Sequence, residues 1–171
     1  MEKNNNKVKF AGNPVTLIGK EIKVGDTAPD FTVLNTGLNP VKLSDFKGDI
    51  KIISIFPSID TGICALQNKR FNKEASNLSD KIKILAISND LPFALGRYCG
   101  AEGLDKVIPL SDHKDVDFGA KYGFLIEELR LLTRGTIVVD QHDIVKYVEY
   151  VPEITTEPNY EAALNAAKEL L

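Results

Sequence analysis

Apolar residues fall in short runs along the chain, and the spacing within each run predicts an element of secondary structure. The nearly continuous runs at 51–56 and 82–88 are typical of strands buried on both faces of a sheet. Further extended segments are expected at 31–34, 41–43, 107–110, 136–140 and 144–150. The last two flank Gln141–Asp143 and are expected to form a hairpin.

Helices are predicted between these strands. Pro57 ends the run 51–56, and a helix is expected to begin around Thr61. Within that helix, Cys64, Phe71, Ala75 and Leu78 fall at offsets of 0, 7, 11 and 14, so they share one face. Further helices are expected from Asn89–Pro92 onward, where a capping side chain precedes a proline, over 115–122, and from 159 or 160 to 171.

Strands that alternate with helices, followed by a hairpin and a closing helix, predict an α/β fold with a central mixed sheet flanked by helices. Val15–Val24 has the pattern of two short strands that meet at Gly19-Lys20, which predicts an N-terminal β-hairpin over about 13–24. The chain has 171 residues, no internal repeat and no linker-like segment, so a single domain over 1–171 is expected.

Charge and composition exclude several classes of partner. The formal net charge is −3, which argues against nucleic acid and against an acidic membrane surface. No window approaches the roughly 20 apolar residues of a membrane span, and the polar start has no secretory pattern, so a cytoplasmic location is expected. Disulfides in the cytoplasm are usually transient and catalytic. The two cysteines are therefore informative, although inert buried thiols are an alternative.

Cys64 lies where reactive cysteines are found. It is expected in the first turn of its helix, where unpaired amides and the positive end of the helix dipole favour an anion. The thiolate is such an anion, and it is the nucleophilic form of cysteine. Thr61 could cap the helix and donate toward the sulfur, and Pro57, which has no amide hydrogen, would stiffen and shield the approach. The alternative is a capped helix whose first-turn cysteine is merely buried.

Other polar residues supply fewer candidates. A cationic partner for Cys64 could be Arg134, just before the strand at 136–140, or Arg130 four residues earlier, whereas Arg70 and Arg97 are expected at the surface. The two histidines, His113 and His142, have no spacing that resembles a zinc site, so no metal is expected. No glycine-rich phosphate loop follows a strand, and no cofactor is expected because two sulfurs can carry the redox equivalents.

Four segments carry a resemblance to a known family. They are Pro57-Ser-Ile-Asp-Thr-Gly-Ile-Cys64, Ser88-Asn-Asp-Leu-Pro-Phe-Ala94, Arg97-Tyr-Cys-Gly-Ala-Glu-Gly103 and Val151-Pro-Glu-Ile-Thr-Thr-Glu-Pro158. The first resembles the peroxidatic loop of peroxiredoxins. Together, from about Asn13 to the C-terminus, they are similar to the bacterial thiol peroxidase subfamily, the atypical two-cysteine peroxiredoxins.

The resemblance implies a thioredoxin-like fold with an added N-terminal hairpin, a homodimer, and thioredoxin as the reductant. It implies that Cys64 reduces hydrogen peroxide and organic hydroperoxides to water and alcohols through a sulfenic acid. Cys99 would be the resolving cysteine that closes a disulfide with Cys64. Arg134 would be the active-site arginine, and Thr61 and Pro57 would be the other catalytic residues, both in the peroxidatic loop. Two other readings remain: a peroxide sensor, and a general disulfide oxidoreductase, although the latter expects a second cysteine where Thr61 or Gln67 stands.

Cys99 is expected just beyond the helix that starts near Pro92. Arg97–Gly103 contains two glycines, which suits a segment that must rearrange. A disulfide requires Cα atoms within about 7 Å, and two cysteines on successive helices are expected to be farther apart. Oxidation is therefore predicted to require local unwinding near one or both residues.

Overall fold

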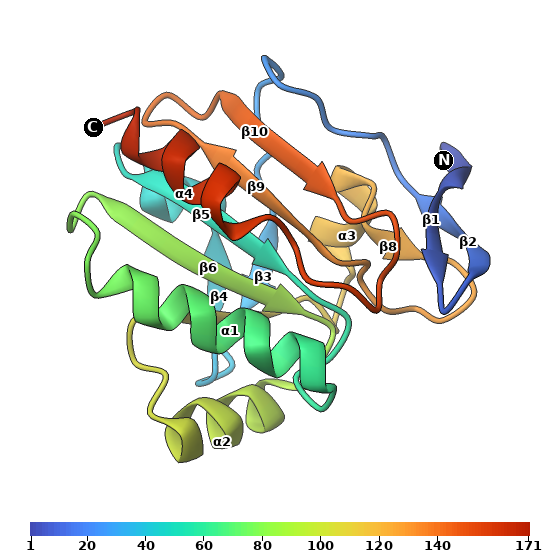
Figure 1. Ribbon diagram of the computed structural model, residues 1–171, viewed down its shortest axis with the longest axis horizontal. Helices are drawn as coiled ribbons and strands as arrows, with labels where there is room; N and C mark the ends of the chain where they lie inside the picture. The colour runs from blue at the N-terminus through green and yellow to red at the C-terminus, as the bar shows by residue number, and fades with distance from the viewer.

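A mixed seven-stranded sheet lies at the centre of the computed structural model, which describes residues 1–171 (Figure 1). The strand order is β10-β9-β5-β6-β7-β3-β4. These strands are β3 (Thr32–Leu34), β4 (Pro40–Lys42), β5 (Ile50–Ile55), β6 (Ile82–Ser88), β7 (Ile108–Ser111), β9 (Gly135–Val139) and β10 (Val145–Tyr150). The helices are the 3-10 helix η1 (Leu43–Phe46), α1 (Gly62–Ala75), α2 (Pro92–Glu102), α3 (Asp117–Tyr122) and α4 (Tyr160–Lys168).

The middle strands explain the apolar runs of the sequence. β5 pairs in parallel with β6 and antiparallel with β9, so Ile52 lies between Ile84 and Val138. All six residues of β5 are buried, as expected for a strand covered on both faces. The predicted mixed sheet is confirmed, and most element boundaries agree with the prediction to within a few residues.

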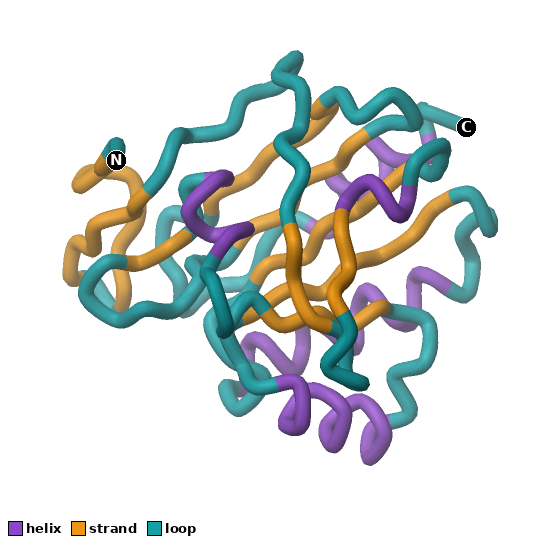
Figure 2. Tube along the Cα trace, turned by 180° about the vertical axis from the view of Figure 1, so that it is seen from behind, coloured by secondary structure: helices purple, strands orange, loops and turns teal.

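Alternate residues of these strands build two separate cores. Ile53, Leu85 and Ile137 point into the core that is covered by α3 and the N-terminal part of the chain, the face seen in Figure 2. Ile52 and Ile84 point into the other core, which is covered by α1, α2 and α4. No helix combines the length and apolar character that a membrane crossing requires.

The N-terminal hairpin exists, but the predicted position over 13–24 is wrong. It is formed by β1 (Lys3–Phe10) and β2 (Asn13–Ile18), with Ala11 and Gly12 at its tip, and β8 (Leu125–Ile126) completes a small second sheet. Gly19 marks the exit from β2 instead of a hairpin turn. A Cβ atom there would lie 2.0 Å from the carbonyl oxygen of Ala120, so this glycine allows a close backbone approach. The polar composition of Lys3–Phe10 concealed β1.

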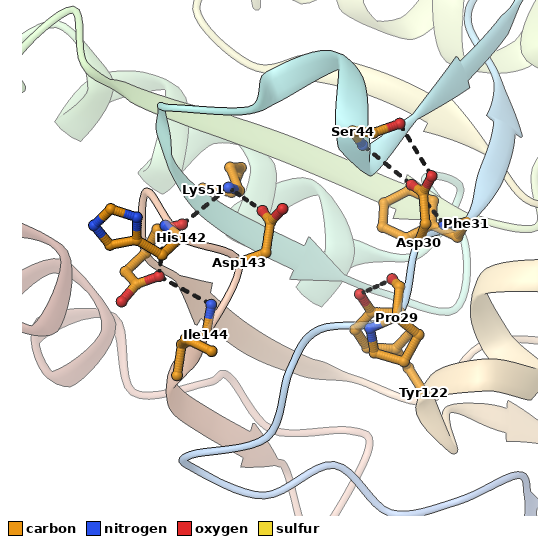
Figure 3. A network of polar contacts seen from close by, with 10 residues as sticks. Pro29, Asp30, Phe31, Ser44, Lys51, Tyr122, His142, Asp143 and Ile144 are labelled. Atoms are coloured by element: carbon orange, nitrogen blue, oxygen red, sulfur yellow. Dashed lines mark hydrogen bonds and ion pairs between the residues drawn. The ribbon is translucent and has the colours of Figure 1, made fainter.

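A buried lysine secures the end of the sheet that is remote from Cys64. The side chain of Lys51 in β5 is fully buried, and its Nζ donates to the carbonyl oxygen of Asp140 (2.9 Å) and to the carboxylate of Asp143 (2.7 Å; Figure 3). Both acceptors belong to the turn between β9 and β10. This lysine therefore joins the central strand to that turn.

Replacement of Lys51 by Met should leave the Asp143 carboxylate and the Asp140 carbonyl without their donor. We expect the free energy of unfolding to fall by about 2–3 kcal/mol, because one member of a largely buried pair is lost. Thermal denaturation should show a Tm lower by roughly 4–12 °C. The exposed Lys81→Met variant is the control and should stay within about 0.5 kcal/mol of wild type. Equal Tm values for the two variants would contradict the role of Lys51.

Candidate functional site

Cys64 lies in the first turn of α1, directly after the loop that leaves β5. Its side chain is fully buried, and its Sγ accepts a hydrogen bond from Nη2 of Arg134 at 3.3 Å. Thr61 precedes the helix in an extended conformation, and its carbonyl oxygen accepts the first helical hydrogen bond from the amide of Ala65. The positive end of the helix dipole and the guanidinium thus both lie beside the same sulfur.

Arg134 is the arginine that reaches Cys64. Its side chain is buried just before β9, where Nε donates to the carbonyl oxygen of Ile154 (2.8 Å) and Nη1 donates to Oε1 of Gln67 (2.8 Å). Arg130, the competing candidate, lies exposed in a turn with a φ of 55°. The guanidinium is therefore held in place by two acceptors besides the sulfur, one in the segment after β10 and one on α1.

Gln67 is a site residue that the sequence analysis did not identify. It lies one turn after Cys64 on α1 and is fully buried, with its Nε2 donating to Oγ of Ser54 (2.7 Å) and to the carbonyl oxygen of Ile55 (3.1 Å). Its amide thus connects the end of β5 to Arg134. A polar residue at a core-facing position three residues after the cysteine was the available signal.

Thr61 does not act as predicted. Its hydroxyl does not cap α1, and Oγ1 donates instead to the carbonyl oxygen of Ser58 at 3.1 Å, within the tight loop that follows Pro57. Because the hydroxyl bonds to this nearby carbonyl, it makes no hydrogen bond to the amides of the first helical turn. Thr61 and Pro57 nevertheless line the same hollow as Arg134, which is described next.

A largely apolar hollow of about 550 Å³ opens beside Arg134. Three parts of the chain form it: the tip of the N-terminal hairpin, the start of α1 and the segment after β10. Its lining residues are Phe10, Pro57, Thr61, Gly62, Ile63, Leu66, Arg134, Ile154 and Thr155. Among these residues, Arg134 donates to Sγ of Cys64, whereas Cys64 itself does not line the hollow.

Cys99 occupies a different environment. It lies inside α2, not beyond it as predicted, and the helix continues to Glu102 before Gly103 ends it with a φ of 66°. The thiol is half-buried, and this burial raises its pKa. Cys64 and Cys99 are both free thiols and are not at disulfide distance, which confirms the predicted separation.

Asp90 joins the two cysteine-bearing regions. Its carboxylate accepts from Oγ of Ser58 (2.8 Å) and the amide of Ile59 (2.8 Å) in the loop before α1. It also accepts from Oγ of Ser88 (2.6 Å) at the end of β6. The prediction that Asn89–Asp90 caps α2 is wrong: Leu91 occupies the cap position, and no side chain bonds the first turn. The Asp90 carboxylate instead accepts hydrogen bonds from the loop before α1.

Metal binding finds no support in the arrangement of side chains. No group of three His, Cys, Asp or Glu residues lies close enough together to hold a metal ion.

Comparison with known proteins identifies the family. Residues 23–164 match the Redoxin family, a span that covers well over half of the chain. The chain belongs to the redoxin family. It is 57% identical to the thiol peroxidase of Oceanobacillus iheyensis over 158 residues, which cover 92% of this chain and 96% of that protein. It is 54% identical to the thiol peroxidase of Bacillus subtilis over 164 residues, which cover 96% and 98% of the two chains.

Solved structures agree on the fold. A peroxiredoxin-like protein from Aquifex aeolicus superposes with a TM-score of 0.91 at 37% identity, over 97% of this chain and 98% of that one. A thiol peroxidase from Chromobacterium violaceum superposes with a TM-score of 0.84 at 24% identity, over 95% of each chain, and supports the fold alone. The protein therefore has the thioredoxin-like peroxiredoxin fold, with the small N-terminal sheet as an addition.

Replacement of Gln67 by Leu should reduce the reactivity of Cys64. The guanidinium would lose an acceptor, and a hydrogen bond to a charged group contributes about 1.5–3 kcal/mol, so we expect alkylation by iodoacetamide at pH 7 to slow about tenfold. Stopped-flow measurement of this rate checks the expectation. Gln141→Leu, which removes a similar amide from its contact with the Leu170 carbonyl, is the control. Equal rates in both variants would show that Gln67 does not orient Arg134.

Proposed function

We propose that this protein is a thiol-dependent peroxidase that reduces hydrogen peroxide and organic hydroperoxides with Cys64 as its nucleophile. The observation that carries the proposal is the 3.3 Å contact between Nη2 of Arg134 and the buried Sγ of Cys64, beside an accessible hollow. Strong identity with thiol peroxidases along nearly the whole chain supports the same reaction.

In the first step, the Cys64 thiolate attacks one oxygen of the peroxide. The S–O bond forms, the O–O bond breaks, and the leaving oxygen takes up a proton to become water or an alcohol. Arg134 offers donors to the sulfur and to the incoming oxygen, because its planar fork can bind two acceptors at once. The Thr61 hydroxyl can rotate from the Ser58 carbonyl toward a peroxide in the hollow, and Pro57 limits access of water.

In the second step, the Cys99 thiol condenses with the Cys64 sulfenic acid. The S–S bond forms and the sulfenic oxygen leaves as water, so Cys64 and Cys99 become a disulfide. The thiols start outside bonding distance, so the start of α1 or part of α2 must unwind first. Gly96 and Gly100 lie on either side of Cys99 and make that change easier in α2.

An external dithiol then reduces the disulfide by exchange, and we propose thioredoxin in this role. The two sulfurs carry both electrons, so the cycle requires no further cofactor. A homodimer remains a prediction that follows from the family resemblance, and a cytoplasmic location remains a prediction that follows from the sequence pattern. The general disulfide oxidoreductase is disfavoured, because Thr61 and Gln67 occupy the positions where a second cysteine would lie.

The Cys64→Ser variant should lose peroxide reduction while keeping its fold. A serine hydroxyl is almost un-ionised at neutral pH, so we expect the rate to fall at least about a thousandfold. The assay couples thioredoxin, thioredoxin reductase and NADPH to peroxide consumption, and circular dichroism verifies the fold. Activity above a few per cent of wild type would refute Cys64 as the nucleophile.

The Cys99→Ser variant should consume about one equivalent of peroxide per chain and then stop, because its sulfenic acid cannot form the intramolecular disulfide. Mass spectrometry should show one added oxygen, or products derived from it, on the Cys64 peptide. The comparison with wild type also distinguishes an enzyme from a peroxide sensor. An enzyme shows sustained turnover in wild type that the variant lacks, whereas a sensor shows no sustained turnover in either. An unchanged steady-state rate would exclude Cys99 as the resolving residue.

A further inference from the structure

The carboxylate of Glu153 fastens the tip of the N-terminal hairpin to the segment after β10. It accepts hydrogen bonds from the amides of Ala11 (3.1 Å) and Gly12 (2.8 Å) at the tip. It also accepts from the amide (3.0 Å) and the hydroxyl (2.8 Å) of Thr155. These bonds, first among them the one from the Thr155 amide, lower the pKa of Glu153 to about 2. The carboxylate is therefore ionised at every physiological pH.

The backbone of the tip is shaped for this anion. Ala11 and Gly12 have φ angles of 49° and 84°, so two successive amides in left-handed conformations turn toward one acceptor. Such a φ is unfavourable for alanine and persists only where surrounding contacts support it. Lys9 also pairs with this segment, since its amide donates to the Pro152 carbonyl (2.8 Å) and its carbonyl accepts from the Ile154 amide (2.9 Å).

Phe10 is the residue that this arrangement positions. It immediately precedes the tip, is partly buried, and forms one wall of the hollow beside Arg134. On the other side of Glu153, the carbonyl oxygen of Ile154 accepts the hydrogen bond from Nε of Arg134. In Figure 1 the hairpin lies beside the segment that joins β10 to α4. Glu153 thus bonds to the two residues that follow Phe10, and the residue that follows Glu153 holds the guanidinium.

We propose that Glu153 determines substrate specificity by holding Phe10 in place as the wall against which the apolar group of an organic hydroperoxide packs. The inference rests on the proposed function. The peroxide oxygens would lie at Arg134, and the organic group would extend toward Phe10, Ile63 and Leu66, which face the same hollow. Hydrogen peroxide has no group that reaches this wall. The hydrogen bonds of Glu153 should therefore affect the reaction with organic hydroperoxides and not the reaction with hydrogen peroxide.

The test compares Glu153→Gln with wild type on cumene hydroperoxide and on hydrogen peroxide, in the thioredoxin-coupled assay. An amide cannot accept all four hydrogen bonds, so the tip should loosen. We expect the ratio of kcat/KM for cumene hydroperoxide to kcat/KM for hydrogen peroxide to fall about three- to tenfold, the size of a lost apolar contact. The change should lie in KM, with kcat for cumene hydroperoxide nearly constant.

Glu128→Gln is the matched control. Both carboxylate oxygens of Glu128 accept from the amide of Thr16 on β2, so this residue fastens the same hairpin, but within β2 and not at the tip next to Phe10. For Glu128→Gln, the ratio of kcat/KM for cumene hydroperoxide to kcat/KM for hydrogen peroxide should equal that of wild type. Phe10→Ala should reproduce the effect of Glu153→Gln, and the double variant should add nothing further, because the two changes remove one interaction.

Other outcomes would overturn the proposal. An equal loss for both peroxides would mean that Glu153 acts through Arg134 or through general stability, and an unchanged ratio would mean that strand pairing alone holds the tip. The failure of the proposed function is distinguishable from either, because wild type would then show no Cys64-dependent peroxide reduction at all.

Discussion

The buried guanidinium of Arg134 is the constraint on which the site depends. A charge that is removed from water must have its donors satisfied, or the folded state is strongly destabilised. Here the acceptors are the Ile154 carbonyl, the Gln67 amide oxygen and the Cys64 sulfur, which come from the segment after β10 and from α1. Satisfying one cation therefore brings distant parts of the chain together around the sulfur.

The two cysteines differ because their surroundings differ. Cys64 is buried, and it has a cation and a helix N-terminus beside it. Cys99 is half-buried in the interior of α2, and its burial raises the pKa of its thiol. This difference supports the proposed roles, in which Cys64 is the nucleophile and Cys99 is the resolving thiol. In the proposed cycle, disulfide formation requires a conformational change, because the two thiols are not at disulfide distance. Asp90, which directly precedes the start of α2, bonds to the loop before α1 and to the end of β6.

Local patterns were enough to predict much of the fold and the central feature of the site. Buried strands at 51–56 and 82–88 could be predicted because continuous apolar runs bounded by turn residues have few other stable arrangements. The position of Cys64 at a helix start followed from Pro57 and Thr61. The hairpin was misplaced because Ala11 at its tip adopts a left-handed conformation that the residue type does not favour.

The sequence by itself determined the central strands, the helix that carries Cys64 and the motifs of the family, because these depend on residues that are close neighbours along the chain. Only the tertiary structure showed that Arg134, which the family resemblance had implied, contacts Cys64, and only it showed why Gln67 is polar and what Glu153 holds. Those contacts join residues that are 70, 67 and 141 positions apart, respectively. Hydrogen bonds act over about 3 Å, so their partners are defined only after the sheet has brought these segments side by side.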